Sequence, residues 1–379
     1  NNTLSIKYDF AKERKKPSGL LSLWVADMDF PVAQEIKDAL IERCNHGIFG
    51  YSEVKTPYYE VIAKWYQEKF NWSTKKQWLV KTPGVVAAIA NAIRAFTNIG
   101  DAVLIQKPVY YPFFLTIEDN QRKVVNNSLV YKNGRYEMDF VDFEEKIISH
   151  KVKLFVLCSP HNPVGRVWNK EELLKLGDIC LKHKVIVVAD EIHADFVYQG
   201  HQHQVFANLK TDYQEITVTC TAPSKTFNIA GLQVSNIFIA NENLRKKFKQ
   251  ELKKTANADI NVMGLIACQA AYSQGEDWLR QVKIYIAENL EYVKTFLRDN
   301  LPQVKLVEPE GTYLLWLDFR ELNLTEEELE DLIINKAKLW VDGGTMFGTE
   351  GVGFQRINIA CPQKILIQAF TQLKEALKQ

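Results

Sequence analysis

The sequence predicts an α/β protein in which helices cover a mostly parallel sheet, joined to a smaller α+β lobe. Between about residues 77 and 240, short apolar runs alternate with helical patterns, as expected of repeated strand–helix–strand units. Several runs are apolar on successive residues, which is typical of strands with helices on both faces. With 379 residues, 46% of them hydrophobic, the chain can bury a core large enough for two lobes.

Six apolar runs are the expected strands of the main sheet. They span residues 78–81, 102–106, 154–158, 185–189, 216–220 and 235–240. Helical patterns separate them, such as 170–183, where leucine, isoleucine and cysteine side chains recur on one face. Ligands of open α/β sheets bind beyond the carboxyl ends of the strands, so the residues that follow these runs are candidates for a site.

The last third of the chain has a different pattern. Residues 259–300 indicate long helices, followed by expected strands at 304–307, 313–319 and 355–360, a helix at 325–336 and a final helix. We expect an N-terminal segment (1–45) that packs with the small domain, a large domain (46–281) and a small C-terminal domain (282–379).

Composition excludes several classes of protein. The net charge is +1 and no basic block stands out, so neither nucleic acid nor a charged membrane surface is an expected partner. The longest apolar runs are too short to cross a bilayer, and residues 1–16 contain no apolar signal segment. Six widely spaced cysteines favour reduced thiols and a cytoplasmic protein. His201 and His203 have no Cys or carboxylate that would complete a metal site, so no metal is predicted.

Three short motifs follow expected strands in order. They read Ser-Pro-His-Asn-Pro at 159–163, Ala-Asp-Glu-Ile-His at 189–193 and Ser-Lys-Thr-Phe-Asn at 224–228. Together they supply an amide, a carboxylate, and a lysine beside hydroxyl groups. These groups can hold pyridoxal 5′-phosphate and tune its ring.

Lys225 is the central candidate. A lysine that bonds an aldehyde must lose its proton, which burial and a nearby positive charge favour. The hydroxyls of Thr221 and Ser224 lie in the same segment and could bind a phosphate. Taken alone, Lys225 would read as a surface lysine in a loop; the other motifs favour the catalytic interpretation.

Asp190 and Asn162 are the expected ring contacts. At the end of its strand, the Asp190 carboxylate could pair with a pyridine nitrogen and keep it protonated; a helix N-cap is the alternative. Asn162 lies in a turn, where its amide could donate to the phenolic oxygen. His193 lies near the same ring position, although a lone histidine is more often structural.

The remaining candidates bind phosphate, ring and substrate. Gly84, Val85 and Val86 open a helix whose free N–H groups suit a phosphate. Tyr110 could stack on the ring or pack in the core. The guanidinium group of Arg356 matches an α-carboxylate, with an exposed salt bridge as the competing role.

These motifs resemble the fold-type I pyridoxal-phosphate enzymes, the aspartate aminotransferase superfamily, over nearly the whole chain. The segments Trp-Val-Ala-Asp-Met-Asp-Phe at 24–30 and Ser-Lys-Thr-Phe-Asn-Ile-Ala-Gly-Leu-Gln at 224–233 are similar to the MalY/PatB cystathionine β-lyase branch. This resemblance implies a seven-stranded, mostly parallel sheet in the large domain and a cofactor bound through Lys225.

The same resemblance implies the role of each site residue. Lys225, Asp190 and Tyr110 would be catalytic, and Arg356 would bind the substrate carboxylate. The cofactor contacts would be Gly84, Val85, Val86, Tyr110, Asn162, Asp190, His193, Thr221, Ser224 and Lys225. Substrate would also meet Ala26, Asp27 and Asn162. Tyr51 would reach into the neighbouring subunit's site, which implies a homodimer with shared active sites.

Two positions depart from the usual aminotransferase pattern. Gln233 replaces an arginine that often binds the phosphate, and His193 replaces a tyrosine. Both changes fit the lyase branch, so we expect β-elimination of L-cystathionine, and of L-cysteine or related sulfur amino acids, to pyruvate, ammonia and a thiol or hydrogen sulfide. An aminotransferase, or a regulatory protein with the same fold, is the alternative.

Overall fold

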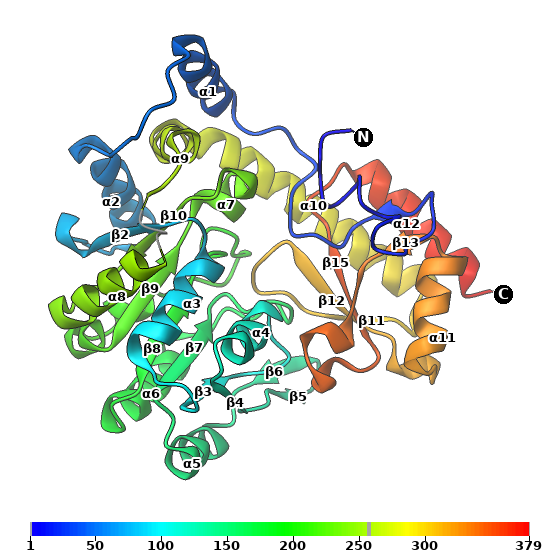
Figure 1. Cartoon of the computed structure of the whole chain (residues 1–379). Coiled ribbons are helices and arrows are strands. Elements are labelled where there is room, and N and C mark those ends of the chain that lie inside the picture. The colour runs from blue at the N-terminus through cyan, green and yellow to red at the C-terminus, as the bar shows by residue number, and fades with distance from the viewer. Residues whose placement is uncertain (1, 256–258, 379) are drawn as a thin grey trace.

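The computed structural model describes residues 2–255 and 259–378 and contains a seven-stranded sheet with helices around it (Figure 1). In spatial order the strands are β2 (Leu79–Thr82), β10 (Ser235–Phe238), β9 (Thr217–Thr221), β8 (Ile186–Asp190), β7 (Leu154–Cys158), β3 (Ala102–Ile105) and β4 (Lys123–Asn126). Only β10 runs antiparallel to its neighbours. The mostly parallel sheet is confirmed. Each of the six predicted runs overlaps a strand with ends that agree to within two residues, and β4 was not predicted.

Helices cover both faces of this sheet. One face packs on α3 (Val85–Phe96), α4 (Pro112–Asp119) and α8 (Glu242–Lys254); the other packs on α5 (Phe140–His150) and α6 (Lys170–Lys182). Successive residues of one strand enter opposite cores: Val156 packs with the first group, whereas Phe155 and Leu157 pack with the second. This double burial explains why the central strands are apolar without alternation.

A second sheet, antiparallel and four-stranded, belongs to the C-terminal part. Its order is β11 (Lys305–Val307), β12 (Leu314–Asp318), β15 (Phe354–Asn358) and β14 (Asp342–Gly343). Its helices are α10 (Glu276–Asn300), α11 (Glu326–Asp331) and α12 (Gln363–Ala376), and the predicted helix at 325–336 ends in a π-helical turn at Leu332–Lys336. The remaining elements are a hairpin of β5 (Val130–Lys132) and β6 (Arg135–Glu137), and helices α2 (Thr56–Phe70), α7 (Pro223–Thr226) and α9 (Val262–Gln274).

The N-terminal segment contacts both parts of the molecule. Strand β1 (Leu21–Ser22) pairs in parallel with β13 (Leu339–Trp340), and the N–H of Asn358 donates to the carbonyl oxygen of Leu23. Helix α1 (Gln34–His46) instead packs against α9. The division of the chain at residues 46 and 282 stays a prediction.

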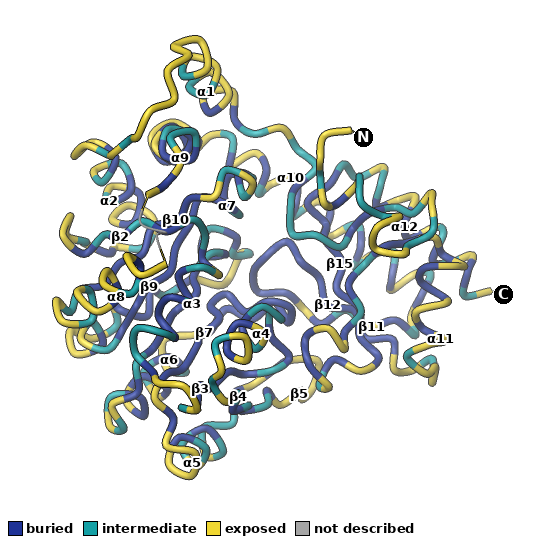
Figure 2. Tube along the Cα trace, viewed as in Figure 1, coloured by how far each residue is buried: buried dark blue, intermediate teal, exposed yellow. Residues whose placement is uncertain are grey.

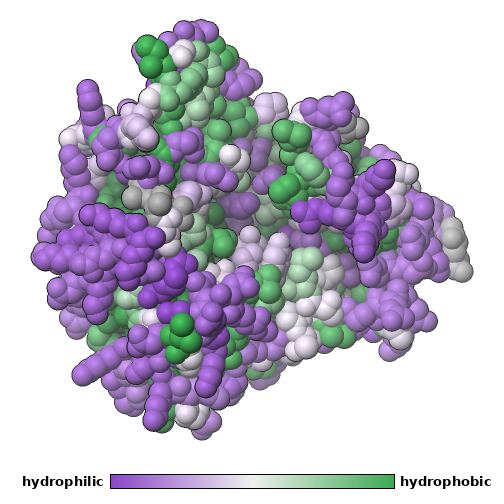
Figure 3. Space-filling view, viewed as in Figure 1, coloured by the Kyte–Doolittle hydropathy of each residue, from purple (hydrophilic) through white to green (hydrophobic). Residues whose placement is uncertain are grey.

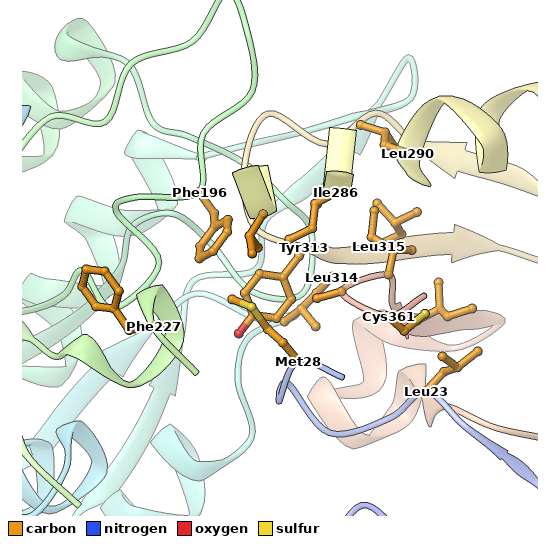
Figure 4. Packing of buried hydrophobic residues seen from close by; sticks show 14 of the residues in the cluster. Leu23, Met28, Phe196, Phe227, Ile286, Leu290, Tyr313, Leu314, Leu315 and Cys361 are labelled. Atoms are coloured by element: carbon orange, nitrogen blue, oxygen red, sulfur yellow. The ribbon is translucent and has the colours of Figure 1, made fainter. Parts of the chain in front are cut away.

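Buried residues join these parts. Figure 2 shows the buried chain in the two sheets and the exposed chain at α1 and the outer helices. In Figure 4, Tyr313, directly before β12, lies between Phe196, in the loop after β8, and Met28 of the N-terminal segment. The Phe196 and Tyr313 rings meet edge to face with centroids 4.9 Å apart. Within the part of the chain described, no helix has the length and apolarity needed to span a bilayer.

Candidate active site

A cavity of about 300 Å³ lies at the carboxyl ends of the parallel strands, facing the small sheet. It is lined by nine of the residues predicted from sequence: Ala26, Val85, Val86, Tyr110, Asn162, Asp190, His193, Lys225 and Arg356. They follow five different strands or come from the N-terminal and C-terminal segments. Parallel strands place their carboxyl ends at one edge of a sheet, which is why residues so distant in sequence converge here.

Lys225 belongs to the four-residue helix α7, directly after β9. Its Nζ atom donates a hydrogen bond to the carbonyl oxygen of Ala26 at 2.9 Å and lies 3.7 Å from Oδ1 of Asp27. Burial lowers the pKa of the Lys225 ammonium, and the Asp27 carboxylate opposes that decrease. The interpretation of Lys225 as a surface lysine is therefore wrong, and its environment favours the neutral amine that attacks aldehydes.

Asp190 ends β8 with its side chain buried in the cavity. Its Oδ1 atom accepts a hydrogen bond of 3.1 Å from the N–H of Ile192, so one oxygen does cap the following turn. Burial raises the pKa of Asp190 to about 7. A cation held against this carboxyl group would favour its ionised form, which is the relation that a protonated pyridine nitrogen requires.

His193 is buried beside the same cavity. Burial, reinforced by the charges of Lys225 and Arg356, lowers the pKa of His193 to about 3, so the imidazole is neutral. Its Nδ1 atom has no hydrogen-bond partner within the described residues. The ring therefore offers a neutral, unengaged nitrogen rather than a charge.

Arg356 rises from β15 and is 3% exposed, so the alternative of an exposed salt bridge is wrong. Its Nη1 atom donates to Oδ1 of Asn162 at 3.0 Å, and Nη2 donates to the carbonyl oxygen of Trp24 at 2.9 Å. Nη2 also pairs with Oδ2 of Asp342, which lies opposite Arg356 in the β14–β15 register. These contacts hold the guanidinium plane in one orientation, while its Nε atom keeps no partner within the described residues.

The amino end of α3 supplies free N–H groups. Gly84, at φ 154°, turns the chain into the helix, and the N–H groups of Val85 and Val86 belong to its first turn. A helix start of this kind suits a phosphate. Thr221 donates its hydroxyl to the carbonyl oxygen of Asn236 at 2.6 Å, so its proton is used inside the sheet.

The donor set fits a planar pyridine that carries an aldehyde and a phosphate. An amine, a carboxyl group, an amide and a tyrosine ring border one cavity beside a helix start. Two buried polar atoms on residues that line it lack partners within the described residues: His193 Nδ1 and Arg356 Nε. Buried polar groups are ordinarily satisfied, so these atoms indicate a polar ligand.

Other predicted residues lie outside the cavity lining. Gly84, Thr221 and Ser224 flank it, and Asp27 meets it through Lys225. The side chain of Tyr51 is fully exposed, so within a single chain it contributes nothing to the site.

Sequence reasoning missed several lining residues, chiefly Ile6, Arg14, Tyr111, Cys158 and Asp342. One sequence signal could have marked Asp342: it is an acidic residue between the apolar run 339–341 and Gly343. Arg14 lies in a charged segment that carries no such signal.

Residues 24–30 form a strap whose first three residues line the cavity. The Asn228 side chain accepts from the N–H of Met28 at 2.9 Å and donates to the carbonyl oxygens of Met28 and Phe30, each at 3.0 Å. Asn358 donates to the carbonyl oxygens of Val25 and Asp27 from the opposite side. The strap is therefore anchored at two points, by Asn228 three residues after Lys225 and by Asn358 two residues after Arg356.

A family model for aminotransferase class I and II matches residues 18–372. The chain belongs to this family. The match spans both sheets, and the seven-stranded, mostly parallel sheet with the smaller α+β part is the architecture expected from the resemblance.

Within the aminotransferase class I and II family, several of the relatives are named cystathionine β-lyases or carbon–sulfur lyases. The chain is 43% identical to cystathionine β-lyase PatB of Bacillus subtilis, covering 99% of this chain and 97% of that one. It is 33% identical to protein MalY of Escherichia coli, covering 100% and 97%. The structure matches that of cystalysin from Treponema denticola, which contains a pyridoxal 5′-phosphate cofactor, with a TM-score of 0.96, 38% identity and coverage of 100% and 96%. The resemblance to the MalY/PatB branch is confirmed.

Proposed function

We propose that this protein is a pyridoxal-phosphate-dependent carbon–sulfur β-lyase. It converts L-cystathionine and water to homocysteine, pyruvate and ammonia, and L-cysteine and water to hydrogen sulfide, pyruvate and ammonia. The observation that carries the proposal is the convergence of Lys225, Asp190, Asn162 and Arg356 on one cavity. Full-length similarity to PatB supports the reaction class.

The residues that would hold the cofactor are those bordering the cavity. Lys225 would bond its aldehyde, Asp190 would pair with its ring nitrogen and Asn162 would donate to its phenolic oxygen. Tyr110 and His193 would contact the ring. The N–H groups at Val85 and Val86, with Gly84 and Ser224, would bind the phosphate, whereas the Thr221 hydroxyl, predicted as a further phosphate contact, already donates to Asn236. When bound, the cofactor withdraws electrons from the substrate α-carbon.

The chain's own groups then bind the substrate and move a proton. Arg356 binds the α-carboxylate through N–H groups that Asp342 does not use, including its unpartnered Nε, and Ala26 of the strap borders the same space. Lys225 would act as the base that takes the proton from the α-carbon. Burial lowers the pKa of Lys225, which favours the neutral amine that this role requires.

The deciding experiment is pyruvate release from L-cystathionine, with pyridoxal phosphate and no keto acid added. Pyruvate and a free thiol in equal amounts are expected, and Lys225→Ala is expected to abolish both. Amino transfer to an added keto acid, without pyruvate release, would instead identify an aminotransferase. If neither reaction is observed, a regulatory role on the same fold is the remaining alternative.

We further propose that two copies form a homodimer in the cytoplasm with shared active sites. Ile41, Ile48, Phe49 and Tyr51 are 55%, 67%, 57% and 105% exposed, and apolar atoms gather on the projecting region of α1 (Figure 3). A contiguous apolar surface of this kind usually meets a partner. Covering it with a second copy would bring Tyr51 to the partner's cavity.

A further inference from the structure

A second cavity of about 610 Å³ adjoins the first one. The two share Arg14, Trp24 and Asp342 in their linings, so they meet at these side chains. The second cavity extends away from Lys225, between the N-terminal segment and helix α11. A substrate whose α-carboxylate is at Arg356 would extend its side chain toward this space.

Arg14 lies where the two cavities meet, and its guanidinium group is not paired with a carboxylate within the described residues. Its guanidinium lies over the Trp24 indole, 5.0 Å from the ring centroid, and Trp24 stacks on Trp340 with centroids 4.6 Å apart. Within the described residues, Arg14 forms no ion pair, whereas neighbouring Lys16 pairs with Glu330 at 2.9 Å. The stacked rings thus hold a guanidinium whose donors are free for a carboxylate.

The wall opposite Arg14 carries negative charge. Glu326, Glu327 and Glu330 of α11 line the second cavity. Glu330 is paired with Lys16, and Glu326 accepts a hydrogen bond of 2.6 Å from the N–H of Gly353. Glu327 has no hydrogen-bond partner within the described residues. One cavity therefore offers both a cation for a carboxylate and a carboxylate for an ammonium.

We propose that this second cavity is a subsite for the far end of a sulfur amino acid that carries a second amino-acid group. Arg14 binds the distal carboxylate, and the acidic wall of α11 attracts the distal ammonium. The substrate class is thioethers with a zwitterionic far end, of which L-cystathionine is one. This inference rests on the proposed lyase function and adds Arg14 as the residue that sets the preference for such substrates.

The preference arises because cysteine and S-alkyl cysteines have nothing to place at Arg14. Charge-assisted hydrogen bonds are stronger than neutral ones, but an exposed arginine contributes less than a buried one. We therefore expect Arg14 to contribute about tenfold to the ratio of kcat/KM for L-cystathionine over kcat/KM for S-ethyl-L-cysteine.

The test is Arg14→Met in the pyridoxal-phosphate-loaded protein, since methionine can still pack on Trp24. The cystathionine preference should fall about tenfold, and Arg14→Lys should restore part of it. Arg298→Met, which removes an exposed arginine of α10, is the matched control. An unchanged ratio, or an equal loss for both substrates, overturns the subsite.

A binding measurement separates this inference from the proposed function. In a Lys225→Ala background, which should not turn over, Kd for L-cystathionine can be titrated by the cofactor's absorbance. Adding Arg14→Met should raise that Kd about tenfold and leave Kd for S-ethyl-L-cysteine within a factor of about two. If the unmodified protein releases no pyruvate, the proposed function fails, and these Kd values alone decide the subsite: a selective rise supports it, and no selective rise overturns it.

Discussion

The Nζ atom of Lys225 lies 3.7 Å from Oδ1 of Asp27, although 198 positions separate the two residues in the chain. Burial lowers the pKa of Lys225, and Arg356 lowers it further, while Asp27 and Asp190 act in the opposite sense. His193 faces the same amine as a neutral ring, because its pKa is about 3. Asp27 is 41% exposed, so solvent screens part of its effect.

Asp27→Asn should therefore lower the pKa of Lys225. A neighbouring carboxylate favours the ammonium, so its removal moves the titration midpoint to lower pH. The midpoint can be measured in cofactor-free protein from the pH dependence of Lys225 acetylation, followed by mass spectrometry. Asp38→Asn, which removes an exposed carboxylate of α1, is the control. A midpoint that stays or rises would show that Asp27 does not govern this amine.

Asp190→Asn should slow turnover and weaken cofactor binding by about 10- to 100-fold, the range for loss of one hydrogen bond to a charged group. The amide keeps the shape of the carboxylate but cannot hold a protonated ring nitrogen. Cofactor affinity by absorbance titration and kcat for pyruvate release measure the two effects. Asp178→Asn, on exposed α6 surface, provides the comparison. If Asp190→Asn kept the wild-type cofactor affinity and kcat, Asp190 would have no role in binding the cofactor.

Asn228→Ala should destabilise the fold by about 2–4 kcal/mol, because three hydrogen bonds between the strap and the Lys225 segment are lost. Asn228 also has φ 55°, where alanine is strained. Urea unfolding measures the change in free energy. Asn133→Ala, at φ 51° on the surface and with no side-chain hydrogen bond within the described residues, reports the backbone strain alone. Equal losses for the two variants would mean that the strap contacts contribute nothing.

Subunit mixing should restore activity if the sites are shared. Tyr51→Ala and Lys225→Ala proteins are each expected to be nearly inactive, and a mixed dimer would contain one intact site. After unfolding and refolding together in equal amounts, about a quarter of wild-type activity should return, since half of the dimers are mixed. Pyruvate release and sedimentation measure the result. If the refolded mixture is no more active than the two variants assayed separately, Tyr51 acts in the active site of its own chain or in neither active site.

The strands of the large sheet could be predicted because burial on both faces leaves a local signature. Phe155, Val156 and Leu157 are successive apolar residues for that reason. Strand β4 has only one buried residue, Val125, and forms the edge of the sheet, so it lacks that signature. The two-residue strands β1 and β14 exist through pairing with distant segments, which no local pattern encodes.

The sequence by itself determined the chemistry available to this protein: which residue types follow the strands, in which order, and hence the family resemblance. Tertiary structure alone decided which charges meet. Asp342 faces Arg356 through strand register, Asp27 approaches Lys225 through the strap, and Arg14 stands between two cavities. Local preferences follow from neighbouring residues, whereas electrostatic partners depend on distances set by packing between segments far apart in the chain.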